Sequence, residues 1–419
     1  MAGHVAAEKY ANTERGVVDS QRPGAGPKIP DLVCFSHLRW DFVYQRPQHL
    51  LTRCARNRRV FFVEEPIFGS GSMRLDVQER DGGVRVVVPH LPEGLRSEIA
   101  TSAVLKEMTR RLFLEQGIRE YVFWYYTPMA LSYTSDFDPI AAVYDCMDEL
   151  SAFKGAPSRL QDFEKILFQH VNLVFTGGQT LYEAKRNQHP AVYAFPSSID
   201  VTHFGKARTV NDDPEDQASI PHPRLGFFGV IDERFDIELL NSLATSRPDW
   251  HFVMIGPVVK IDPDSLPKHP NIHYLGPKKY DQLPEYLAGW DVALLLFARN
   301  ESTRFISPTK TPEYLAAGKP VISTSIRDVV RPYGELELVR IADQATDFIQ
   351  AAEEVLQAEP HEKAAWLARV DEFLANISWD KTWAEMSLLL DRVIDERSSH
   401  TTPAPVVYVK QRAATAAGT

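Results

Sequence analysis

The sequence predicts an α/β protein made of two doubly wound domains that face each other across a cleft. The chain has 419 residues, which is too long for one compact core and favours two domains. Short apolar segments of strand length alternate with helical segments along most of the chain, which is typical of parallel sheets covered by helices. The alternation restarts after a polar segment near the middle, and two such sets indicate two Rossmann-like domains.

The first set of elements begins with an apolar strand at 32–36 and a helix at 47–56. Further strands are expected at 60–63, 84–89, 121–125, 141–144, 173–176 and 192–194, and helices at 101–116 and 158–170. In an open α/β sheet, ligands bind at the carboxyl ends of the strands. The loops that follow these strands are therefore expected to face the cleft.

The second set follows residues 206–222, which are polar, acidic and Pro-containing and predict a linker. Strands are expected at 224–228, 251–255, 272–274, 292–296, 321–323 and 337–341, and helices at 236–246, 282–288, 311–317 and 344–357. Residues 1–28 and 399–419 are polar or rich in small residues, and we expect them to be disordered tails.

Composition narrows the class of protein. Hydrophobic residues make up 44% and charged residues 24% of the chain, and the formal net charge is −10; this charge argues against a nucleic-acid binder. Cys34, Cys54 and Cys146 lie far apart without a CxxC spacing, which fits reduced thiols in a cytosol. No apolar run approaches the roughly 18 residues that span a bilayer, and the N-terminus lacks an apolar signal core. We therefore expect a cytoplasmic protein.

The most informative segment is Ser307–Thr324. It places Lys310 and Glu313 at the start of a short helix that leads into a strand. A lysine there can meet phosphate oxygens, and the free N–H groups of a helix start favour anions. A carboxylate one turn later can accept both hydroxyls of a ribose. The pair predicts a nucleotide-diphosphate site, and the alternative is an ordinary amphipathic helix with an exposed Lys and Glu.

The segment resembles the donor-binding segment of GT-B glycosyltransferases of the family 4 type (glycosyl transferases group 1). Their pattern is Ser/Glu-Pro-x-Lys-x-x-Glu-x-x-Ala-x-Gly-x-Pro-Val, and it is matched here by Ser307, Pro308, Lys310, Glu313, Ala316, Gly318, Pro320 and Val321. Pro196–Phe204 resembles the end of their N-terminal domain, and Ser378–Trp383 resembles their closing tryptophan motif, so the resemblance covers roughly residues 30–396. It implies the GT-B fold, with a nucleotide sugar as co-substrate and no separate cofactor.

The resemblance also implies a domain plan and further donor ligands. We expect an N-terminal acceptor domain at 29–205, the linker at 206–222, a donor domain at 223–378 and a helix at 379–398 that crosses back to the first domain. Donor-binding candidates besides Lys310 and Glu313 are Ser307, Thr309, Gly229, Arg234 and Gly256. Gly229 lets the backbone pass close to a ligand. Arg234 is expected on phosphate or uracil oxygens, or alternatively paired with Asp232 or Asp236, and Gly256 is either a ligand contact or a framework turn.

One departure from the family pattern bears on mechanism. Retaining enzymes of family 4 carry a second glutamate eight residues before the ribose-binding one, and Phe305 stands at that position here. The lysine-containing motif looks closer to xanthan-type glucuronosyltransferases, which are inverting, and to teichuronic-acid glycosyltransferases. Inversion needs a general base for the acceptor hydroxyl. Asp148 resembles the base of the xanthan-type enzyme and is the first candidate; Asp145 is the second, and each is alternatively a helix cap or an ion-pair partner.

The acceptor side is expected in the first domain. His37, Arg46 and His49 follow its first strand, and Tyr126 ends an aromatic strand, so all four are acceptor-binding candidates. From Arg39 to Arg59 there are six arginines and one acid. That local excess of positive charge predicts contact with anionic lipid headgroups or a lipid-linked pyrophosphate, or alternatively a solvated helix face.

Together these residues predict a glycosyltransferase. It would move a sugar from a nucleotide-diphosphate sugar, with UDP favoured, to a glycan or lipid-linked acceptor in cell-envelope or exopolysaccharide synthesis, at the cytoplasmic face of the membrane or free in the cytoplasm. Lys310 would offset the charge of the leaving diphosphate, so no metal site is expected. The alternatives are a GT-B-fold nucleotide-sugar epimerase and a catalytically silent scaffold that binds a nucleotide sugar.

Overall fold

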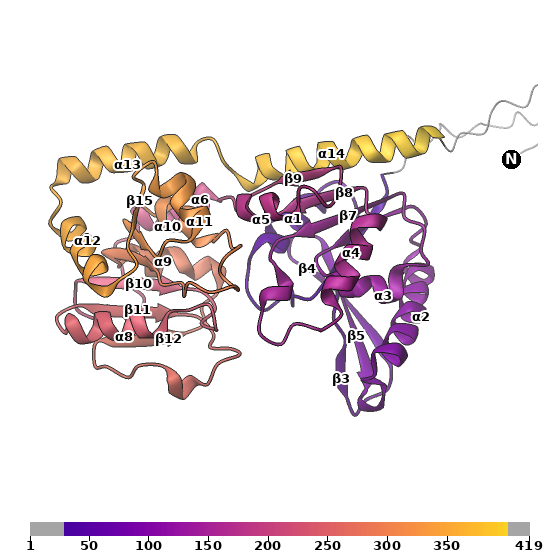
Figure 1. The fold of residues 1–419 in the computed structure, drawn as a ribbon, viewed down its shortest axis with the longest axis horizontal. Coiled ribbons are helices and arrows are strands. Elements are labelled where there is room, and N and C mark those ends of the chain that lie inside the picture. Colours follow the sequence, from indigo (N-terminus) through magenta and orange to yellow (C-terminus); the bar gives the residue numbers. More distant parts are fainter. Residues whose placement is uncertain (1–28, 401–419) are drawn as a thin grey trace, which may run out of the picture.

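The computed structural model describes residues 29–400, which form two α/β halves side by side (Figure 1). The tails predicted at 1–28 and 399–419 lie outside the described residues, except that the last helix continues to His400. None of the helices in this part of the chain is long and apolar enough to cross a membrane.

The first half is built on a nine-stranded sheet. Its strands are β1 (Asp31–Ser36), β2 (Val60–Glu64), β3 (Ile67–Gly69), β4 (Arg74–Arg80), β5 (Val84–Pro92), β6 (Tyr121–Tyr125), β7 (Ala141–Cys146), β8 (Leu173–Thr176) and β9 (Val192–Ala194). Their order is β3-β5-β2-β1-β6-β7-β8-β9, with β4 pairing antiparallel to β5 and the other pairs parallel. The chain order reverses between β1 and β6, and their carboxyl-end loops therefore open onto a crevice.

Helices cover both faces of this sheet. They are α1 (Arg46–Cys54), α2 (Glu98–Gln116), α3 (Leu131–Thr134), α4 (Leu160–His170) and α5 (Gln179–Lys185). Successive residues of a strand point to opposite faces, so Leu32 and Cys34 of β1 enter one hydrophobic cluster, while Val33 and Phe35 enter the other. A strand buried on both faces reads as a continuous apolar run, which is the pattern that made β1 predictable.

The second half has a six-stranded parallel sheet in the order β12-β11-β10-β13-β14-β15. The strands are β10 (Arg224–Phe228), β11 (His251–Ile255), β12 (Ile272–Gly276), β13 (Val292–Leu295), β14 (Val321–Ser323) and β15 (Val339–Ile341). The helices are α6 (Val201–Gly205), α7 (Glu215–Ala218), α8 (Ile237–Ser246), α9 (Leu283–Ala288), α10 (Lys310–Ala316), α11 (Arg327–Val329), α12 (Ala345–Gln357) and α13 (Pro360–Leu374). This strand order is the one found in dinucleotide-binding domains, and the order reverses between β10 and β13.

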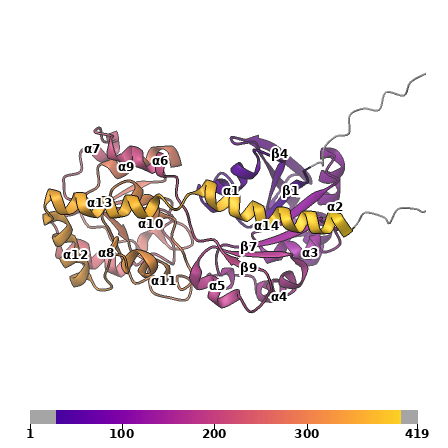
Figure 2. The ribbon, with the colours of Figure 1, turned by 90° about the horizontal axis from the view of Figure 1, so that it is seen from above.

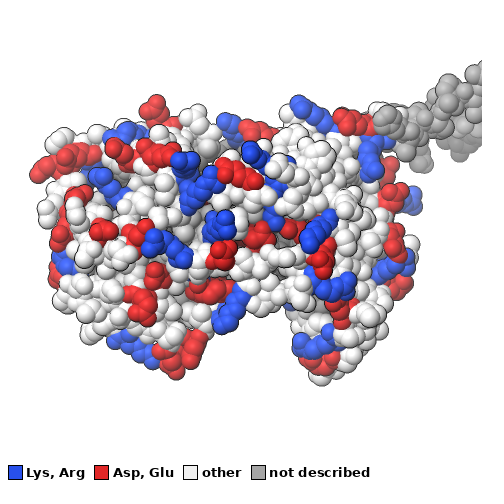
Figure 3. Space-filling view, in the orientation of Figure 1, with Lys and Arg blue, Asp and Glu red and all other residues white. Residues whose placement is uncertain are grey.

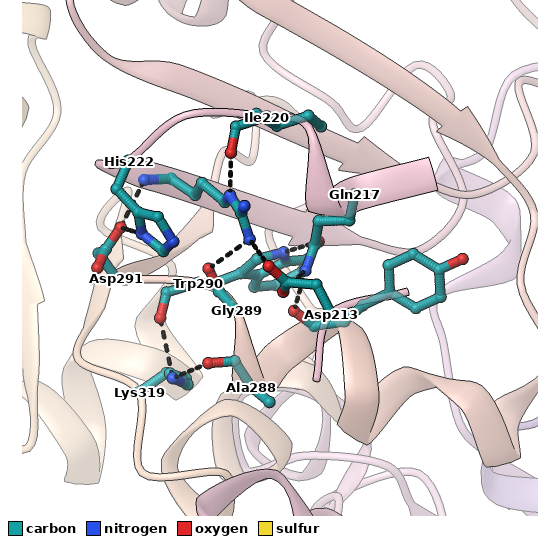
Figure 4. A network of polar contacts seen from close by, with 11 residues as sticks. Asp213, Gln217, Ile220, His222, Ala288, Gly289, Trp290, Asp291 and Lys319 are labelled. Atoms are coloured by element: carbon teal, nitrogen blue, oxygen red, sulfur yellow. Dashed lines mark hydrogen bonds and ion pairs between the residues drawn. The ribbon is translucent and has the colours of Figure 1, made fainter. Parts of the chain in front are cut away.

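The polar segment at 206–222 is fastened to the second half (Figure 4). Within it, Gln217 of α7 donates to the Asp213 carboxylate at 3.1 Å and accepts from the Trp290 indole at 3.0 Å. Arg224 at the start of β10 closes the network on Asp213 at 2.7 Å. The segment therefore contains ordered structure despite its linker composition.

The last helix, α14 (Trp379–His400), runs along the first half, whereas α13 runs along the second (Figures 1 and 2). Trp379, Trp383, Met386 and Leu390 of α14 are part of the hydrophobic cluster that also holds β1 and α1. The helix thus buries its apolar stripe on the domain opposite to the one it follows. This is the crossing-back helix that the sequence predicted.

Candidate active site

The loops that follow β10, β11 and β12 lie directly on one another. Gly229 donates its backbone N–H to Ile255 at 2.8 Å, and Gly256 donates to Gly276 at 2.9 Å. A Cβ atom on Gly256 would lie 1.8 Å from the carbonyl oxygen of Gly229. Gly256 is therefore required by close backbone packing, which accounts for its place in the sequence without a ligand contact.

Gly229 makes room for Lys310, the first residue of α10. Gly229 has a φ of 139°, and a Cβ there would lie 2.1 Å from Cε of Lys310. The Lys310 ammonium lies 5.8 Å from the ring centre of Phe227 and 5.9 Å from that of Phe297. No hydrogen bond or ion pair within residues 29–400 engages it. The ammonium is thus available to ligand oxygens at the carboxyl ends of β10 and β13.

Glu313 lies one helical turn after Lys310 and is 5% exposed. Its carboxylate has no hydrogen-bond partner in the described part of the chain. Burial raises the pKa of Glu313, and the Lys310 ammonium opposes that shift. Burial also lowers the pKa of Lys310, against the attraction of Glu313. The ammonium and the carboxylate thus lie near each other without a hydrogen bond, and a polar ligand would supply their missing hydrogen-bond partners.

Asp148 faces this pair from the first domain, in the loop after β7. Burial raises its pKa to about 6; the Lys310 ammonium and the Arg234 guanidinium, both on the second domain, oppose the rise. No hydrogen bond engages its carboxylate among the described residues. Asp148 therefore lies within electrostatic reach of the predicted donor residues, and Figure 3 shows a notch between the two halves at the lower edge of the molecule.

Asp145, the second candidate base, has a different environment. It is fully buried, and Arg46, 3% exposed, donates to both of its carboxylate oxygens at 3.0 and 3.1 Å. Arg46 also donates to the carbonyl oxygen of Phe195 at 2.7 Å. This is the ion-pair alternative for Asp145. It ties α1 to β7 and the segment after β9, and it leaves Asp148, which is only partly exposed, as the carboxylate of this segment without an ion-pair partner among residues 29–400.

Arg234 forms the predicted ion pair with Asp232, and its contact with phosphate or uracil oxygens stays a prediction. Its guanidinium pairs with Asp232 at 2.7 Å, and it also lies 5.4 Å from the ring centre of Phe153, in the first domain. Its charge lowers the pKa of Asp148 across the cleft. Asp232 therefore holds the Arg234 guanidinium where its charge reaches Asp148 of the first domain.

Ser307 and Thr309 lead into α10 at the interface between the domains. The carbonyl oxygen of Ser307 accepts a hydrogen bond from the Ser197 hydroxyl of the first domain at 2.7 Å. Thr309 stands at the N-cap of α10, and its side chain makes no capping hydrogen bond. Both remain candidate donor ligands.

The acceptor candidates divide into two groups. His37 follows β1; burial lowers its pKa, and the Lys260 charge adds to that shift, so His37 lies within electrostatic reach of the second domain. His49 and Tyr126 are 2% and 1% exposed. His49 stacks on Trp379 of α14 at 4.6 Å, and Tyr126 belongs to the core beside α14. The structure thus places His37 within electrostatic reach of the second domain, and it places Arg46, His49 and Tyr126 inside the first domain.

The arginines between Arg39 and Arg59 all have carboxylate partners. The pairs are Arg39 with Glu64, Arg46 with Asp145, Arg53 and Arg56 with Asp380, Arg58 with Asp391, and Arg59 with Asp31. Three of these arginines fasten α14 to the first domain. The cluster of positive charge in the sequence is thereby neutralised in the fold, and the predicted membrane contact stays a prediction without free arginines to support it. Figure 3 likewise shows both signs of charge side by side on the visible face.

Three features of the cleft have no clear signal in the sequence. Phe153 lies between two cations of the second domain, and Lys260 adopts a positive φ of 61° that a lysine does not reveal in sequence. Asp328 receives hydrogen bonds from Thr180 of the other domain. The nearby Asp262 caps a turn by accepting the backbone N–H of Asp264, and Asp264 pairs with Lys268. No cluster of three or more potential metal ligands occurs among residues 29–400.

Comparison with known proteins defines the class. Residues 222–358 match the family model described as Glycosyl transferases group 1. The two-domain architecture matches solved GT-B structures over most of the chain. The protein therefore has the GT-B fold, and its second domain matches the model of the group 1, family 4-like glycosyltransferases, as the sequence motif predicted.

The individual relatives are as follows. The chain is 26% identical over 256 residues to the putative teichuronic acid biosynthesis glycosyltransferase TuaH of Bacillus subtilis (strain 168), covering 56% of this chain and 63% of that protein, less than two thirds of its length. Sucrose-phosphate synthase from Thermosynechococcus elongatus superposes with a TM-score of 0.66 at 14% identity, covering 88% of this chain and 100% of that one. An E. coli structure described as trehalose-6-phosphate bound with UDP-2-fluoro glucose has a TM-score of 0.64 at 10% identity, with 87% and 99% covered. WaaG, a glycosyltransferase involved in lipopolysaccharide biosynthesis, has a TM-score of 0.57 at 13% identity, with 85% and 98% covered.

Proposed function

We propose that the chain is a glycosyltransferase that moves a sugar from a UDP-sugar to a hydroxyl group of a glycan or lipid-linked acceptor in cell-envelope or exopolysaccharide synthesis. The observation that carries the proposal is a set of three charged groups that lack hydrogen-bond partners in the described part of the chain. Lys310 and Glu313 lie on the second domain, and Asp148 faces them from the first.

The donor end would work as follows. The Lys310 ammonium binds the diphosphate and offsets the negative charge that grows on it as the sugar leaves. This is charge that a metal ion supplies in other sites, so the proposed reaction needs no metal. Glu313 accepts the two ribose hydroxyls. Arg234, held by Asp232, adds a second cation near the phosphates.

The acceptor end would use Asp148 as general base. Its carboxylate takes the proton of the acceptor hydroxyl as the oxygen attacks the anomeric carbon. The new glycosidic bond forms while the bond between the anomeric carbon and the diphosphate oxygen breaks, and UDP leaves with that electron pair. A single displacement inverts the anomeric centre. A pKa of about 6 keeps most of Asp148 ionised at neutral pH and still basic enough to accept a proton.

Several observations support the class of substrate and the location. The B. subtilis relative carries a teichuronic acid biosynthesis name, and the E. coli neighbour was solved with UDP-2-fluoro glucose. All three cysteines are buried and free, which fits the cytoplasmic location proposed for the enzyme. The cytoplasmic face of the membrane is the proposed place for a lipid-linked acceptor.

A panel of nucleotide sugars in a thermal-shift assay, followed by UDP-release assays with and without cell-envelope extract, tests this proposal. We expect one or a few UDP-sugars to raise the melting temperature, and UDP release that depends on the extract. Asp148→Asn should lower the rate of release by about 100-fold or more, and it should leave UDP binding unchanged. Asp264→Asn, on an exposed turn, is the matched control and should behave as the wild type.

Other outcomes would identify the alternatives. Conversion of a UDP-sugar to its epimer without acceptor would indicate the epimerase. Binding of a UDP-sugar without turnover in any extract would indicate the scaffold. A full rate in Asp148→Asn would place the base elsewhere.

A further inference from the structure

The carboxylate of Glu233, in the loop between β10 and α8, is buried without a hydrogen bond. Both of its oxygens are shielded from solvent, and neither has a donor within residues 29–400. The nearest cation, the Lys260 ammonium, lies 3.9 Å from Oε1, beyond hydrogen-bond distance. The ion pair with Lys260 offsets part of the cost of burying this carboxylate, but both oxygens still lack hydrogen-bond donors in the described part of the chain. Such a group in a native fold calls for an explanation.

The backbone holds Glu233 in place from two sides. Ile231, two residues earlier, exchanges backbone hydrogen bonds with Pro257 and Val259, each at 3.0 Å. The side-chain amide of Asn300 donates to the carbonyl oxygen of Glu233 at 3.3 Å. The neighbouring Arg234 pairs with Asp232 and makes no hydrogen bond to the Glu233 carboxylate. The position of this carboxylate, which lacks hydrogen-bond donors, therefore follows from the fold of the loop.

Lys260 reaches the same place from the loop after β11. Its φ of 61° lies in the left-handed region, which costs a non-glycine residue energy and is concentrated at functional sites. The ammonium lies 5.3 Å from the ring centre of Phe153 of the first domain. Its side chain is about half exposed, and Glu233 is its carboxylate neighbour. This backbone conformation thus places the Lys260 ammonium at the boundary between the domains.

His37 of the first domain lies within electrostatic reach of the Lys260 ammonium. Its Nδ1 atom is buried and has no hydrogen-bond partner among the described residues. Burial lowers the pKa of His37 to about 4, and the Lys260 charge contributes to that shift. The imidazole is therefore neutral at pH 7, with one nitrogen free to donate or accept.

One kind of ligand would satisfy all three groups. A carboxylate with two free oxygens accepts hydrogen bonds from two adjacent hydroxyls, the ammonium donates to a third oxygen, and the imidazole engages one more. An anion would meet the Glu233 carboxylate, and a cation would meet Lys260, so a neutral ring with vicinal hydroxyls fits best. We propose that Glu233, together with Lys260 and His37, binds the vicinal hydroxyls of a sugar ring in the cleft and determines which sugar the enzyme takes. This inference rests on the proposed function, and the sugar belongs either to the donor or to the acceptor.

Calorimetric titration of Glu233→Gln with UDP and with the best UDP-sugar of the thermal-shift panel tests the site. The quantity to compare is the ratio of the two dissociation constants. If the ring is the donor's, Glu233→Gln should shift that ratio against the UDP-sugar by about 10-fold, since a hydrogen bond to a charged group is worth about that much. UDP affinity itself should stay unchanged. If the ring is the acceptor's, the ratio should stay constant while the KM for the acceptor rises by about 10-fold.

The controls separate a failed site from a failed function. Glu238→Gln changes an exposed glutamate in the first turn of α8 and should alter neither quantity. Unchanged UDP affinity in Glu233→Gln shows that the variant is folded. If the ratio of dissociation constants and the acceptor KM both keep their wild-type values, Glu233 only forms an ion pair with Lys260, and the proposed sugar site is refuted. If the wild type binds no UDP-sugar, the proposed function fails, and this site fails with it.

Discussion

At the scale of single residues, lack of a partner distinguishes the cleft from the rest of the surface. The arginines between Arg39 and Arg59 all meet carboxylates, and Figure 3 shows both signs of charge side by side on the visible face. Lys310, Glu313 and Asp148 form no ion pair within the described part of the chain. Because charged groups are costly to bury without partners, their convergence on one cleft argues for a polar ligand.

The environment of Asp148 predicts the pH dependence of transfer. A general base works as the carboxylate, and burial raises the pKa of Asp148 to about 6. We expect kcat/KM to be constant above that pH and to fall about 10-fold per pH unit below it, because the protonated form is inactive. Asp148→Glu should retain an acidic limb, and the residual rate of Asp148→Asn should lack one. An acidic limb centred near pH 4, the range of an ordinary carboxylate, would contradict burial as the cause.

Gly229 predicts a steric effect on the donor site. A Cβ at this position would overlap Cε of Lys310, so Gly229→Ala should displace the ammonium. We expect UDP to bind about 10-fold more weakly, as it should in Lys310→Ala, because each variant loses a charge-assisted contact. Gly276→Ala is the matched control: Gly276 also has a positive φ, at 69°, but its Cβ would meet no atom within 4 Å. Equal losses of UDP affinity in the two glycine variants would assign the effect to backbone strain.

At the scale of elements, α4 and α5 support the loop that carries Asp148. Lys185 of α5 is buried and contacts Glu149, the residue after Asp148, and Glu164 of α4, each at 2.7 Å. Glu164 also accepts from the Tyr144 hydroxyl of β7 at 2.8 Å. This buried network fixes the direction in which the loop leaves β7. Lys185 is therefore a positioning residue for the proposed base.

Removal of Lys185 should affect turnover more than donor binding. In Lys185→Met, Glu149 loses its cation, and a shift of the Asp148 loop by about 1 Å is enough to lower kcat by about 100-fold. The UDP dissociation constant should hold, because Lys310 lies on the other domain. Lys185→Arg keeps the charge and should recover part of kcat. Parallel losses of kcat and UDP affinity, with a lower melting temperature in both variants, would indicate general destabilisation instead.

The elements differ in how far the sequence predicted them. Strands buried on both faces, such as β1 and β10, were predictable because their residues are continuously apolar. β4 was missed because Arg74–Arg80 is polar, partly exposed and paired only at the edge of the sheet. α13 was missed as well, since only Val370 and Leu374 of its residues are buried and its apolar stripe is weak.

The site was predictable only where its residues are neighbours in sequence. Lys310 and Glu313 stand three positions apart on one helix, so the motif contains their geometry. Arg46 and Asp145 are 99 positions apart, and nothing local shows that they neutralise each other. The same limit applies to Arg53, whose partner Asp380 is 327 positions away. A local excess of charge therefore could not be read as a free charged surface.

At the scale of the whole molecule, the two domains are joined at the edge of the donor site. The Asp328 carboxylate at α11 accepts hydrogen bonds from the backbone N–H of Thr180, at 3.0 Å, and from the Thr180 hydroxyl, and thereby caps α5 of the other domain. A Cβ on Gly178 would lie 2.2 Å from the second oxygen of Asp328, so the surfaces meet closely. Ser197 binds the carbonyl of Ser307 beside this contact. The segment that leads to Lys310 is thus attached to the first domain.

This attachment predicts that Asp328 and Thr180 act as one unit in closing the cleft. Asp328→Asn and Thr180→Val should each lower kcat/KM by about 10-fold, because the closed arrangement that brings Asp148 to the donor loses its hydrogen bonds between the two domains. UDP affinity should stay unchanged, because Lys310 and Glu313, the proposed ligands of UDP, both lie on the second domain. The double variant should be no worse than either single variant, since both remove the same contact. Small-angle scattering should show a larger radius of gyration for the variants than for the wild type with UDP bound. Additive losses, or an unchanged radius, would show that the domains close without this contact.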